Sequence, residues 1–421
     1  MKSTRIFIGA AIMLSFLFAS CGNQGTNESS KSKGALVSSA AEKVYVAPGE
    51  RDEQYAFLSG GYSGNLTVYG LPSGRLFKEI PVFSQFPTSG YGYSEETKPM
   101  LNTSFGFVPW DDLHHPDISQ TKGELDGRWI FVNGNNTPRI ARISLSTFET
   151  EEIMEIPNSA GNHSSSFITE NTEYVVAGTR FSVPVPQRDM PISEYKSNFK
   201  GALTFIEVEP EHGHLDIKFQ LLMPGFNYDL SHPGRDKSHG WFFFSTYNTE
   251  EANTLLEVNA SQNDKDFIAA INWKKIEEYV NSGGGTKMPA NYAHNVYDEA
   301  THSATSTMKK EVLVVNPSEV PGAIFLLPTP KSPHGCDVDP TGQYIIGSGK
   351  LSADLTVHSF DKMLDAIAGE KFDGEAYGIP ILKFEDVMAG QVKSGGLGPL
   401  HTEFDGKGNA YTTFFISSEV V

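Results

Sequence analysis

The sequence predicts an all-β fold and, within that class, a β-propeller. Of its 421 residues, 40 are glycine and 24 are proline, which sit badly in helices and mark tight turns between strands. Aromatic residues make up 11% of the chain and apolar residues 39%, which is ample for a large buried core. Short apolar runs recur along the chain, each introduced by a turn. A propeller has this organisation because each of its blades is a small antiparallel meander.

The strands are predicted from runs of four to eight residues that are rich in aromatic and β-branched side chains. These runs are 55–58, 65–69, 128–132, 174–177, 241–246, 343–346 and 409–416. Three of them open with a turn of one kind, at 126–129, 340–344 and 405–408. The pattern allows five to seven blades, and it also fits an array of β-sandwiches. Two segments show helical periodicity instead, 267–280 and 360–368, and we expect them as insertions between blades.

The N-terminus predicts export from the cytoplasm. Lys2 and Arg5 precede an apolar run over 6–18, and small residues then lead up to Cys21. We therefore expect residues 1–20 to be a signal peptide of the lipoprotein type, with Cys21 acylated. The mature protein would be periplasmic and anchored to the membrane by lipid. The alternative is a buried N-terminal helix.

Composition limits the remaining possibilities. The formal net charge of −18 argues against a nucleic-acid binder, because such a protein needs a basic face. Two cysteines are too few for a disulfide scaffold. Residues 21–43 are polar and rich in Ser, Asn and Gly, as is typical of a flexible tether. The folded domain should therefore occupy residues 44–421.

The twelve histidines carry the chemistry of this sequence. His163, His334 and His401 lie ten or eleven residues before an aromatic strand residue. In a propeller such positions lie on or just before the innermost strands, so imidazoles from different blades can converge near the axis. A set of nitrogen ligands favours copper or zinc over calcium or magnesium. The adjacent pair His114 and His115, followed by a proline that stiffens the loop, strengthens the prediction of a metal site.

Several blocks of the sequence resemble nitrous-oxide reductases. In chain order they are DLHHP at 112–116, DGRWIFVN at 126–133, STYNTE at 245–250, PHG at 333–335 and GPLH at 398–401. They follow the order of that family from about residue 100 to the C-terminal end, and we know no other family that joins the HHP, PHG and GPLH blocks. The resemblance implies a seven-bladed β-propeller around CuZ, a tetranuclear copper–sulfide centre bound by histidines.

Carried over residue by residue, the resemblance implies five copper ligands in this chain: His114, His115, His163, His334 and His401. The two other histidine ligands of the family lie in blocks that would follow Val421. The same holds for the C-terminal cupredoxin domain with its dinuclear CuA centre. We therefore expect a truncated propeller that lacks its closing strands and cannot assemble the complete cluster by itself.

The resemblance also implies a calcium ion near the copper centre, held by oxygen ligands from Tyr247, Glu250, Val258 and Asp264. Glu250 and Asp264 could instead be solvated surface acids. Lys350 is a candidate for orienting polar groups near the centre.

The remaining histidines carry no ligand role in the family. His232 and His239 flank a turn, and we expect them to support the ligands or the fold rather than to bind metal. A solvent-exposed position is the expectation for five others: His212, His214, His294, His302 and His358.

The implied reaction is the reduction of N₂O to N₂ and water by two electrons and two protons, the last step of denitrification. Electrons would come from a small periplasmic donor, a cytochrome c or a cupredoxin, and the full-length enzyme would be a homodimer. Three alternatives stay open: a non-catalytic periplasmic scaffold, a zinc hydrolase and an inactive truncated reductase. The scaffold leaves the pair His114 and His115 unexplained, and no His-Glu-x-x-His cluster supports the hydrolase.

Overall fold

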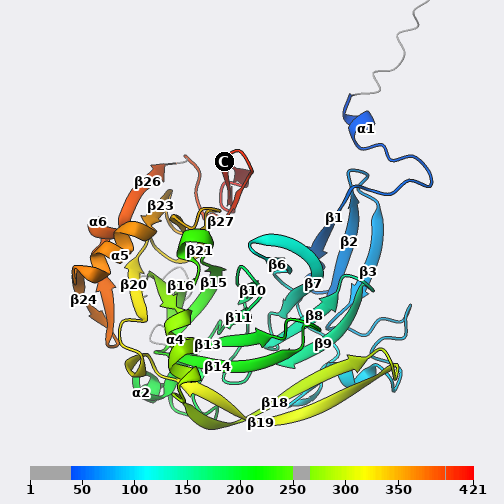
Figure 1. Ribbon diagram of the computed structural model, residues 1–421, viewed down its shortest axis with the longest axis horizontal. Helices are drawn as coiled ribbons and strands as arrows, with labels where there is room; N and C mark the ends of the chain where they lie inside the picture. Colours follow the sequence, from blue (N-terminus) through cyan, green and yellow to red (C-terminus); the bar gives the residue numbers. More distant parts are fainter. Residues whose placement is uncertain (1–38, 250–265, 394) are drawn as a thin grey trace, which may run out of the picture.

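The computed structural model describes residues 39–249, 266–393 and 395–421. Their strands form mostly antiparallel sheets arranged in an arc around a common centre (Figure 1). This arrangement confirms the predicted all-β, propeller-like fold. The predicted signal peptide, 1–20, and Cys21 lie outside the described residues. The end of the predicted tether holds a short helix, α1 (Ser39–Lys43).

Six blade-like units follow one another along the described chain. Unit 1 comprises β1 (Gln54–Ser59), β2 (Asn65–Leu71) and β3 (Leu76–Pro81). Unit 2 comprises β6 (Asp117–Thr121), β7 (Glu124–Gly134), β8 (Arg139–Ser144) and β9 (Glu149–Glu155). Unit 3 comprises β10 (Ser164–Ile168), β11 (Tyr174–Gly178), β13 (Phe199–Val208) and β14 (Leu215–Met223).

The second half of the chain continues the same pattern. Unit 4 comprises β15 (Phe226–Pro233), β16 (Trp241–Thr249), β17 (Phe267–Asn272) and β20 (Ile324–Pro328), extended by β25 (Ile379–Leu382) and β24 (Phe372–Ala376). Unit 5 comprises β21 (Pro333–Val338), β22 (Tyr344–Gly349), β23 (Asp354–Ser359) and β26 (Met388–Lys393). Unit 6 comprises β27 (Pro399–Phe404), β28 (Ala410–Phe414) and β29 (Glu419–Val420). The predicted number of seven blades stays a prediction.

A long hairpin ties two units together. β18 (Thr286–Asp298) and β19 (Ser303–Val315) leave unit 4 after α4 (Trp273–Asn281) and run across the outer edges of units 2 and 3 (Figure 1). β18 pairs with β9, and β19 pairs in parallel with β14. Units 2 and 3 therefore share one continuous sheet through this hairpin. No apolar run predicts this hairpin, because its strands are polar over most of their length.

Each predicted strand run overlaps a strand, and two other local predictions need correction. The predicted helix 267–280 is a strand, β17, over its first half, because these apolar residues pair with β16 on one side and β20 on the other. The helix α4 begins only at Trp273, where the Asn272 side chain accepts a hydrogen bond from Lys275 N at 3.0 Å. The second predicted helix, 360–368, is confirmed as α5 (Phe360–Ala368).

The predicted turn at 126–129 lies inside β7 instead. The chain reverses at Lys122 and Gly123, which have φ angles of 55° and 76°. The carboxylate of Asp126 then accepts hydrogen bonds from the hydroxyls of Ser119 and Thr121, where the register of β6 and β7 shifts. These bonds stabilise a bulge, which has the same Asp-Gly composition as a turn.

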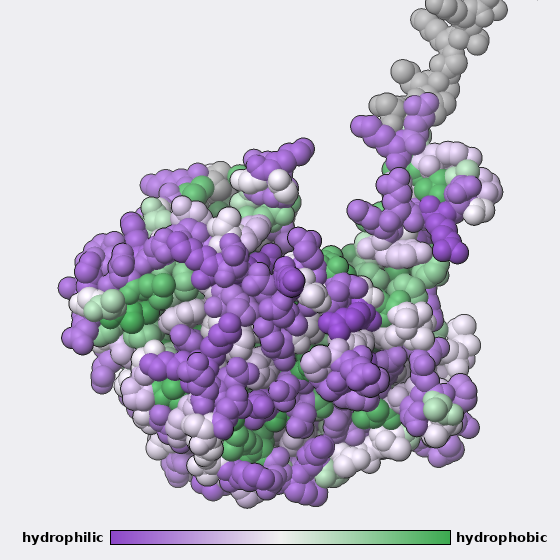
Figure 2. Space-filling model, in the orientation of Figure 1, coloured by the Kyte–Doolittle hydropathy of each residue, from purple (hydrophilic) through white to green (hydrophobic). Residues whose placement is uncertain are grey.

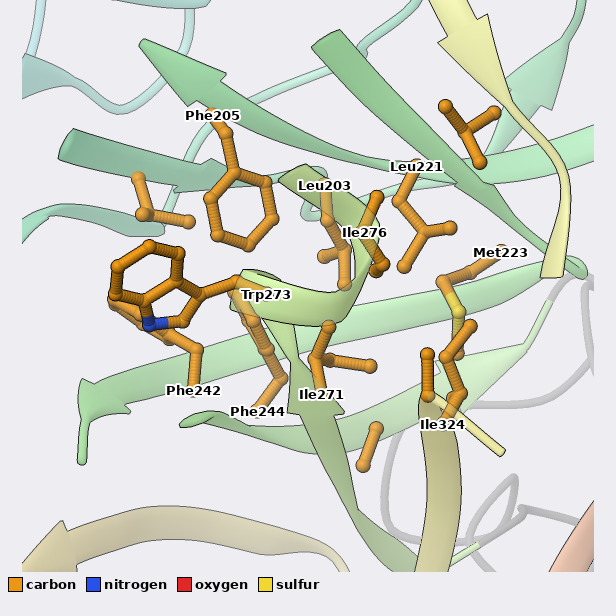
Figure 3. Close-up of a cluster of buried hydrophobic side chains, with 14 of the residues drawn as sticks. Leu203, Phe205, Leu221, Met223, Phe242, Phe244, Ile271, Trp273, Ile276 and Ile324 are labelled. Carbon is orange, nitrogen blue, oxygen red and sulfur yellow. The ribbon is translucent and has the colours of Figure 1, made fainter. Parts of the chain in front are cut away.

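The largest core cluster joins units 3 and 4. Phe205 of β13 packs against Phe242 of β16, and Trp273 and Ile276 of α4 lie between the two sheets (Figure 3). Successive residues of β16 alternate between cores, because Phe242 faces this cluster while Phe243 faces the next one. A strand buried on both faces explains the continuous apolar run at 241–246. This packing fixes the positions of the inner strands.

The outside of the molecule is mostly hydrophilic on the face shown in Figure 2, with a notch between units 1 and 6. Within the described part of the chain, no helix has the length and apolar character needed to cross a membrane.

Candidate metal centre

The first strands of successive units lie next to one another at the centre of the arc. β6 contacts β10, β10 contacts β15, β15 contacts β21, and β21 contacts β27. Four of these five strands carry or directly follow a predicted ligand. His114 and His115 lie on the loop before β6, and His163 directly precedes β10. His334 is the second residue of β21, and His401 is the third residue of β27.

The structure brings all five predicted imidazoles together. One ring nitrogen from each of His114, His115 and His163 lies within 4.8 Å of the others. The ring of His163 lies 5.7 Å from that of His334, and His115 lies 5.8 Å from His401. His334 Nε2 and His401 Nε2 are 3.1 Å apart. The five rings therefore form one contiguous cluster.

A buried carboxylate that no sequence motif predicts, Asp229, contacts two of these rings. Asp229 lies on β15, the one of the five central strands that neither carries nor directly follows a predicted copper ligand. Its Oδ2 accepts a hydrogen bond from His334 Nδ1 at 2.6 Å, and its Oδ1 lies 3.1 Å from His163 Nδ1. The backbone carbonyl of Asp229 also accepts from His163 Nδ1, at 2.5 Å. Only the position of a carboxylate on an inner strand could have indicated this residue beforehand.

These contacts assign the proton-bearing nitrogen of three rings. His115 Nδ1 donates to the carbonyl of His163 at 2.8 Å, and the Nδ1 atoms of His163 and His334 face Asp229. Carbonyl and carboxylate oxygens can only accept, so each Nδ1 carries the proton and each Nε2 keeps its lone pair. A metal-binding histidine has this arrangement, with its second nitrogen fixed by an acceptor.

Burial favours the neutral form of three of the rings, because it lowers the pKa of His114, His115 and His401. It lowers the pKa of His115 well below its usual value, and the neighbouring rings, His163 first, lower it further. Burial also lowers the pKa of His401 to about 3, with a further contribution from His334. Burial acts to raise the pKa of Asp229, but the His334, His163 and Lys350 contacts together hold it well below its usual value. Neutral imidazoles beside a buried anion suit a cation.

The two predicted supporting residues occupy different positions. Lys350 Nζ lies 2.9 Å from Asp229 Oδ2, so Lys350 contacts the carboxylate that orients two of the rings. His232 lies further along β15, and its Nδ1 contacts the carbonyl of Pro233 at 2.7 Å. Burial lowers the pKa of His232 to about 3. In the described ranges, no hydrogen bond or ring contact joins His232 to the five imidazoles.

Gly335, in the PHG block, allows β21 and β27 to lie close together. A Cβ on Gly335 would lie 2.1 Å from the carbonyl oxygen of Leu400 in β27. Any larger residue would push β21 and β27 apart, and with them His334 and His401. The glycine therefore belongs to the geometry of the site and not to a turn.

The predicted calcium ligands are mostly beyond what the structure describes. Tyr247 lies in β16, whereas Glu250, Val258 and Asp264 lie outside the described residues. The calcium site therefore stays a prediction.

The other histidines only partly follow the prediction of exposed positions. The side chains of His212 and His214 are 64% and 58% exposed, and His302 is exposed too. The prediction is wrong for His358, which is fully buried in β23 beside Phe384. It is also wrong for His294, whose Nε2 contacts the buried Glu152 at 2.6 Å. His358 lies beside α6 (Phe384–Val387), and the pairing of β18 with β9 brings His294 next to Glu152. Both neighbours are distant in the sequence, so no local pattern indicates them.

His239 lies between two carboxylates. Its Nδ1 is 3.2 Å from Glu170 and its Nε2 is 3.4 Å from Glu173, so both ring nitrogens face acids from unit 3. His239 therefore links units 3 and 4, and its contacts in the described part of the chain do not include the five rings.

The residues present fit a copper centre. The donor set consists of imidazole nitrogens without thiolate, which suits copper or zinc. The Nδ1 of His114 is buried without a hydrogen bond and lies 3.4 Å from Asp112 Oδ1. A structural role would not require five imidazoles in one cluster with a buried carboxylate beside them.

Comparison with known proteins agrees with this reading. The chain is 30% identical to the nitrous-oxide reductase of Stutzerimonas stutzeri over 425 residues, which cover 100% of this chain and 60% of the relative. It is 30% identical to the nitrous-oxide reductase of Cupriavidus necator over 445 residues, covering 99% and 62%. The chain thus spans about 60% of the length of the curated relatives it matches. No protein-family model matches it.

Among solved structures, the hydrazine synthase of Kuenenia stuttgartiensis superposes with a TM-score of 0.52 at 14% identity, covering 87% of this chain and 79% of that one. That likeness concerns the fold alone. The sequence similarity, which extends over the whole chain, relates this protein to the nitrous-oxide reductases and matches it to their N-terminal portion.

Proposed function

We propose that this chain is the propeller portion of a nitrous-oxide reductase that reduces N₂O to N₂ and water at a CuZ-type copper–sulfide centre. The observation that carries the proposal is the convergence of five imidazoles from the loops and strands at the centre of the arc. The relatives named nitrous-oxide reductase support it at the level of the family.

Five residues would hold the coppers: His114, His115, His163, His334 and His401. When bound, a multi-copper centre supplies several redox-active metals to an inert substrate that a single metal reduces poorly. The chain's own task is to present the lone pairs of the rings in one place. Asp229 orients two rings through their Nδ1 protons, and the His163 carbonyl orients His115. These contacts therefore orient the rings in the metal-free chain.

Charge balance is the second contribution of the protein. Asp229 is only 2% exposed, and a buried carboxylate needs compensating partners. Lys350 provides a cation 2.9 Å away, and the two Nδ1–H groups provide charge-assisted hydrogen bonds. The carboxylate therefore remains ionised and continues to accept a hydrogen bond from each of the two Nδ1–H groups. An ionised Asp229 also favours the cationic metals that the rings would bind.

Several properties of the full-length enzyme form part of the proposal. Its electrons would come from a small periplasmic cytochrome c or cupredoxin, and it would act as a homodimer. A calcium ion would be bound by Tyr247, Glu250, Val258 and Asp264. Elemental analysis of the Glu250→Gln/Asp264→Asn variant checks this site, because it should lose calcium while the five imidazoles are unchanged. Retention of stoichiometric calcium would contradict the assignment.

The localisation is also part of the proposal. Residues 1–20 would direct export, and Cys21 would be acylated and anchor the protein to the periplasmic face of a membrane. Metabolic labelling with a palmitate analogue should mark the wild type and leave Cys21→Ser unlabelled. Equal labelling of both would refute the lipid anchor without affecting the copper site.

Activity is tested by N₂O consumption with a reduced viologen as donor, using the protein purified from its native host. We expect turnover by the wild type and its loss in His334→Ala. The matched control is His212→Ala, because His212 is exposed and distant from the cluster. A copper-loaded wild type without turnover, or an active His334→Ala variant, would refute the proposed reaction.

A further inference from the structure

The loop that carries His114 and His115 lacks regular structure. Between β5 (Gly106–Phe107) and β6, only Leu113 makes isolated bridges, to Gly61 and Gly134. A loop without a ladder of backbone hydrogen bonds must be held by other contacts if its two rings are to keep a fixed position.

A fully buried ion pair lies directly before these rings. Asp111 and Arg139 have side chains that are 0% exposed, and Arg139 Nη2 lies 3.1 Å from Asp111 Oδ2. The guanidinium group also packs over the ring of Phe83, 4.8 Å from its centroid. Such a pair is weak evidence for stability, since two apolar residues would often serve the fold as well. Its presence here therefore points to a geometric role.

Each partner of the pair holds a different part of the loop. Arg139 Nη1 donates to the carbonyl of Val108 at 3.2 Å, and Nη2 donates to the carbonyl of Trp110 at 3.1 Å. Asp111 binds the turn between β7 and β8, because it accepts from the backbone N–H groups of Asn136 and Thr137, both at 3.0 Å. The pair thus connects the loop before β6 to β8 and to the turn between β7 and β8.

The carboxylate of Asp111 fits against β7 because residue 134 is a glycine. A Cβ on Gly134 would lie 2.4 Å from Asp111 Oδ2, so only glycine lets Asp111 sit against β7. From this fixed point the chain runs along the end of β7: Asn135 N donates to the carbonyl of Asp112, and His114 N donates to the carbonyl of Asn133, both at 2.9 Å. These two bonds hold the start of the double histidine against the end of β7, directly after Asp111.

We propose that the Asp111–Arg139 pair is the positioning device of the double-histidine loop, and that it sets the metal affinity of the centre without touching the metal. This inference rests on the proposed function only in assuming that His114 and His115 bind metal. The two residues contact neither ring. They act by holding the backbone on both sides of Asp111.

The test compares three variants of the full chain with a matched control. Asp111→Asn keeps the shape and removes the charge, and Arg139→Met removes the donors to both loop carbonyls. The Asp111→Asn/Arg139→Met double variant leaves no uncompensated buried charge, so it should fold even if a single variant does not. Arg142→Gln is the control, because Arg142 lies on the same strand and is 3% exposed, but it pairs with Glu151 and Glu152 of β9 instead of with the loop.

Two readouts are needed. The first is the affinity and visible spectrum of bound Co²⁺, used alone as the probe metal. The second is amide hydrogen exchange of Leu113 and His114. We expect the three variants to bind Co²⁺ at least about tenfold more weakly, with an altered spectrum and about tenfold faster exchange at these amides. Arg142→Gln should lower thermal stability and leave both readouts as in the wild type.

Each outcome decides the inference. Wild-type affinity and exchange in the double variant would overturn it, and so would equal losses in Arg142→Gln, which would indicate a general effect of stability. If the wild type binds no Co²⁺, or His114→Ala keeps full affinity, the proposed metal centre fails instead. Exchange at Leu113 and His114 then decides positioning alone: local acceleration supports the inference, and unchanged rates refute it.

Discussion

Asp229→Asn is the substitution that probes the support of the imidazole cluster most directly. In the wild type, one carboxylate faces His334 Nδ1 at 2.6 Å, His163 Nδ1 at 3.1 Å and Lys350 Nζ at 2.9 Å. An asparagine offers one acceptor oxygen and one NH₂ group, so it can accept from only one of the two rings. The ring that faces the NH₂ group loses its side-chain acceptor, and we expect it to move or to shift its proton to Nε2; His163 also donates to the backbone carbonyl of residue 229, which the substitution leaves in place. A proton on Nε2 occupies the nitrogen that would bind metal.

The magnitude follows from the loss of a buried charge with three partners. Breaking a buried ion pair costs about 3–5 kcal/mol, and we expect Asp229→Asn to lower the free energy of unfolding of the metal-free chain by about 3 kcal/mol. Loss of a residue that orients metal-bound histidines typically lowers metal affinity by about 10–100-fold. The pKa of Asp229 is held well below its usual value, so its stabilisation is complete above about pH 4 and is lost only as pH falls through the folded-state pKa.

Three assays follow the substitution: denaturant unfolding at pH 7, metal titration, and NMR of the histidine tautomers. Glu311→Gln is the control, because it removes an exposed ion pair with Lys287 and should change stability by less than about 1 kcal/mol. The reasoning is refuted if Asp229→Asn is as stable as this control and both His163 and His334 keep their proton on Nδ1.

Two further predictions concern other parts of the molecule. Gly335→Ala should destabilise the chain by about 1–3 kcal/mol and weaken metal binding, because its Cβ would lie 2.1 Å from the Leu400 carbonyl. The control is Gly406→Ala, whose Cβ meets nothing within 4 Å and should change neither property. Equal unfolding curves and metal affinities for the two variants would contradict the close approach of β21 and β27. His358 is fully buried and neither of its ring nitrogens is hydrogen-bonded, and burial lowers its pKa from 6.5 to about 4. As the pH falls, the imidazole is therefore protonated in the unfolded chain before it is protonated in the folded chain. The free energy of unfolding should fall by about 3 kcal/mol between pH 6.5 and pH 4. In His358→Phe this loss should disappear, and a difference in unfolding free energy that is independent of pH over that range would show that His358 is not the responsible group.

The features that the sequence predicted are those with a local signal. Continuous apolar runs such as 241–246 belong to strands buried on both faces, and the turn residues around them set the spacing of the blades. The five imidazoles could be named because short blocks such as PHG and GPLH carry them. Their convergence then follows from the propeller, which places the first strand of each unit at the centre.

The features that the sequence did not predict depend on contacts between distant residues. Asp229 is 66 residues from His163 and 105 from His334, so nothing near it in the chain indicates its partners. His358 lies beside α6 (Phe384–Val387), and the pairing of β18 with β9 brings His294 next to Glu152. In 267–280, an apolar period close to that of a helix masked a strand whose two neighbours, β16 and β20, cannot be identified locally.

The central claim is that the five imidazoles bind a copper centre. The most direct measurement is the copper content and copper X-ray absorption spectrum of the protein from its native host, compared with the His114→Ala/His115→Ala variant. We expect imidazole nitrogen and sulfide ligation in the wild type. The variant should lose this copper while its circular dichroism is unchanged. A wild type without copper, or a variant with the same copper content and spectrum, would contradict the claim.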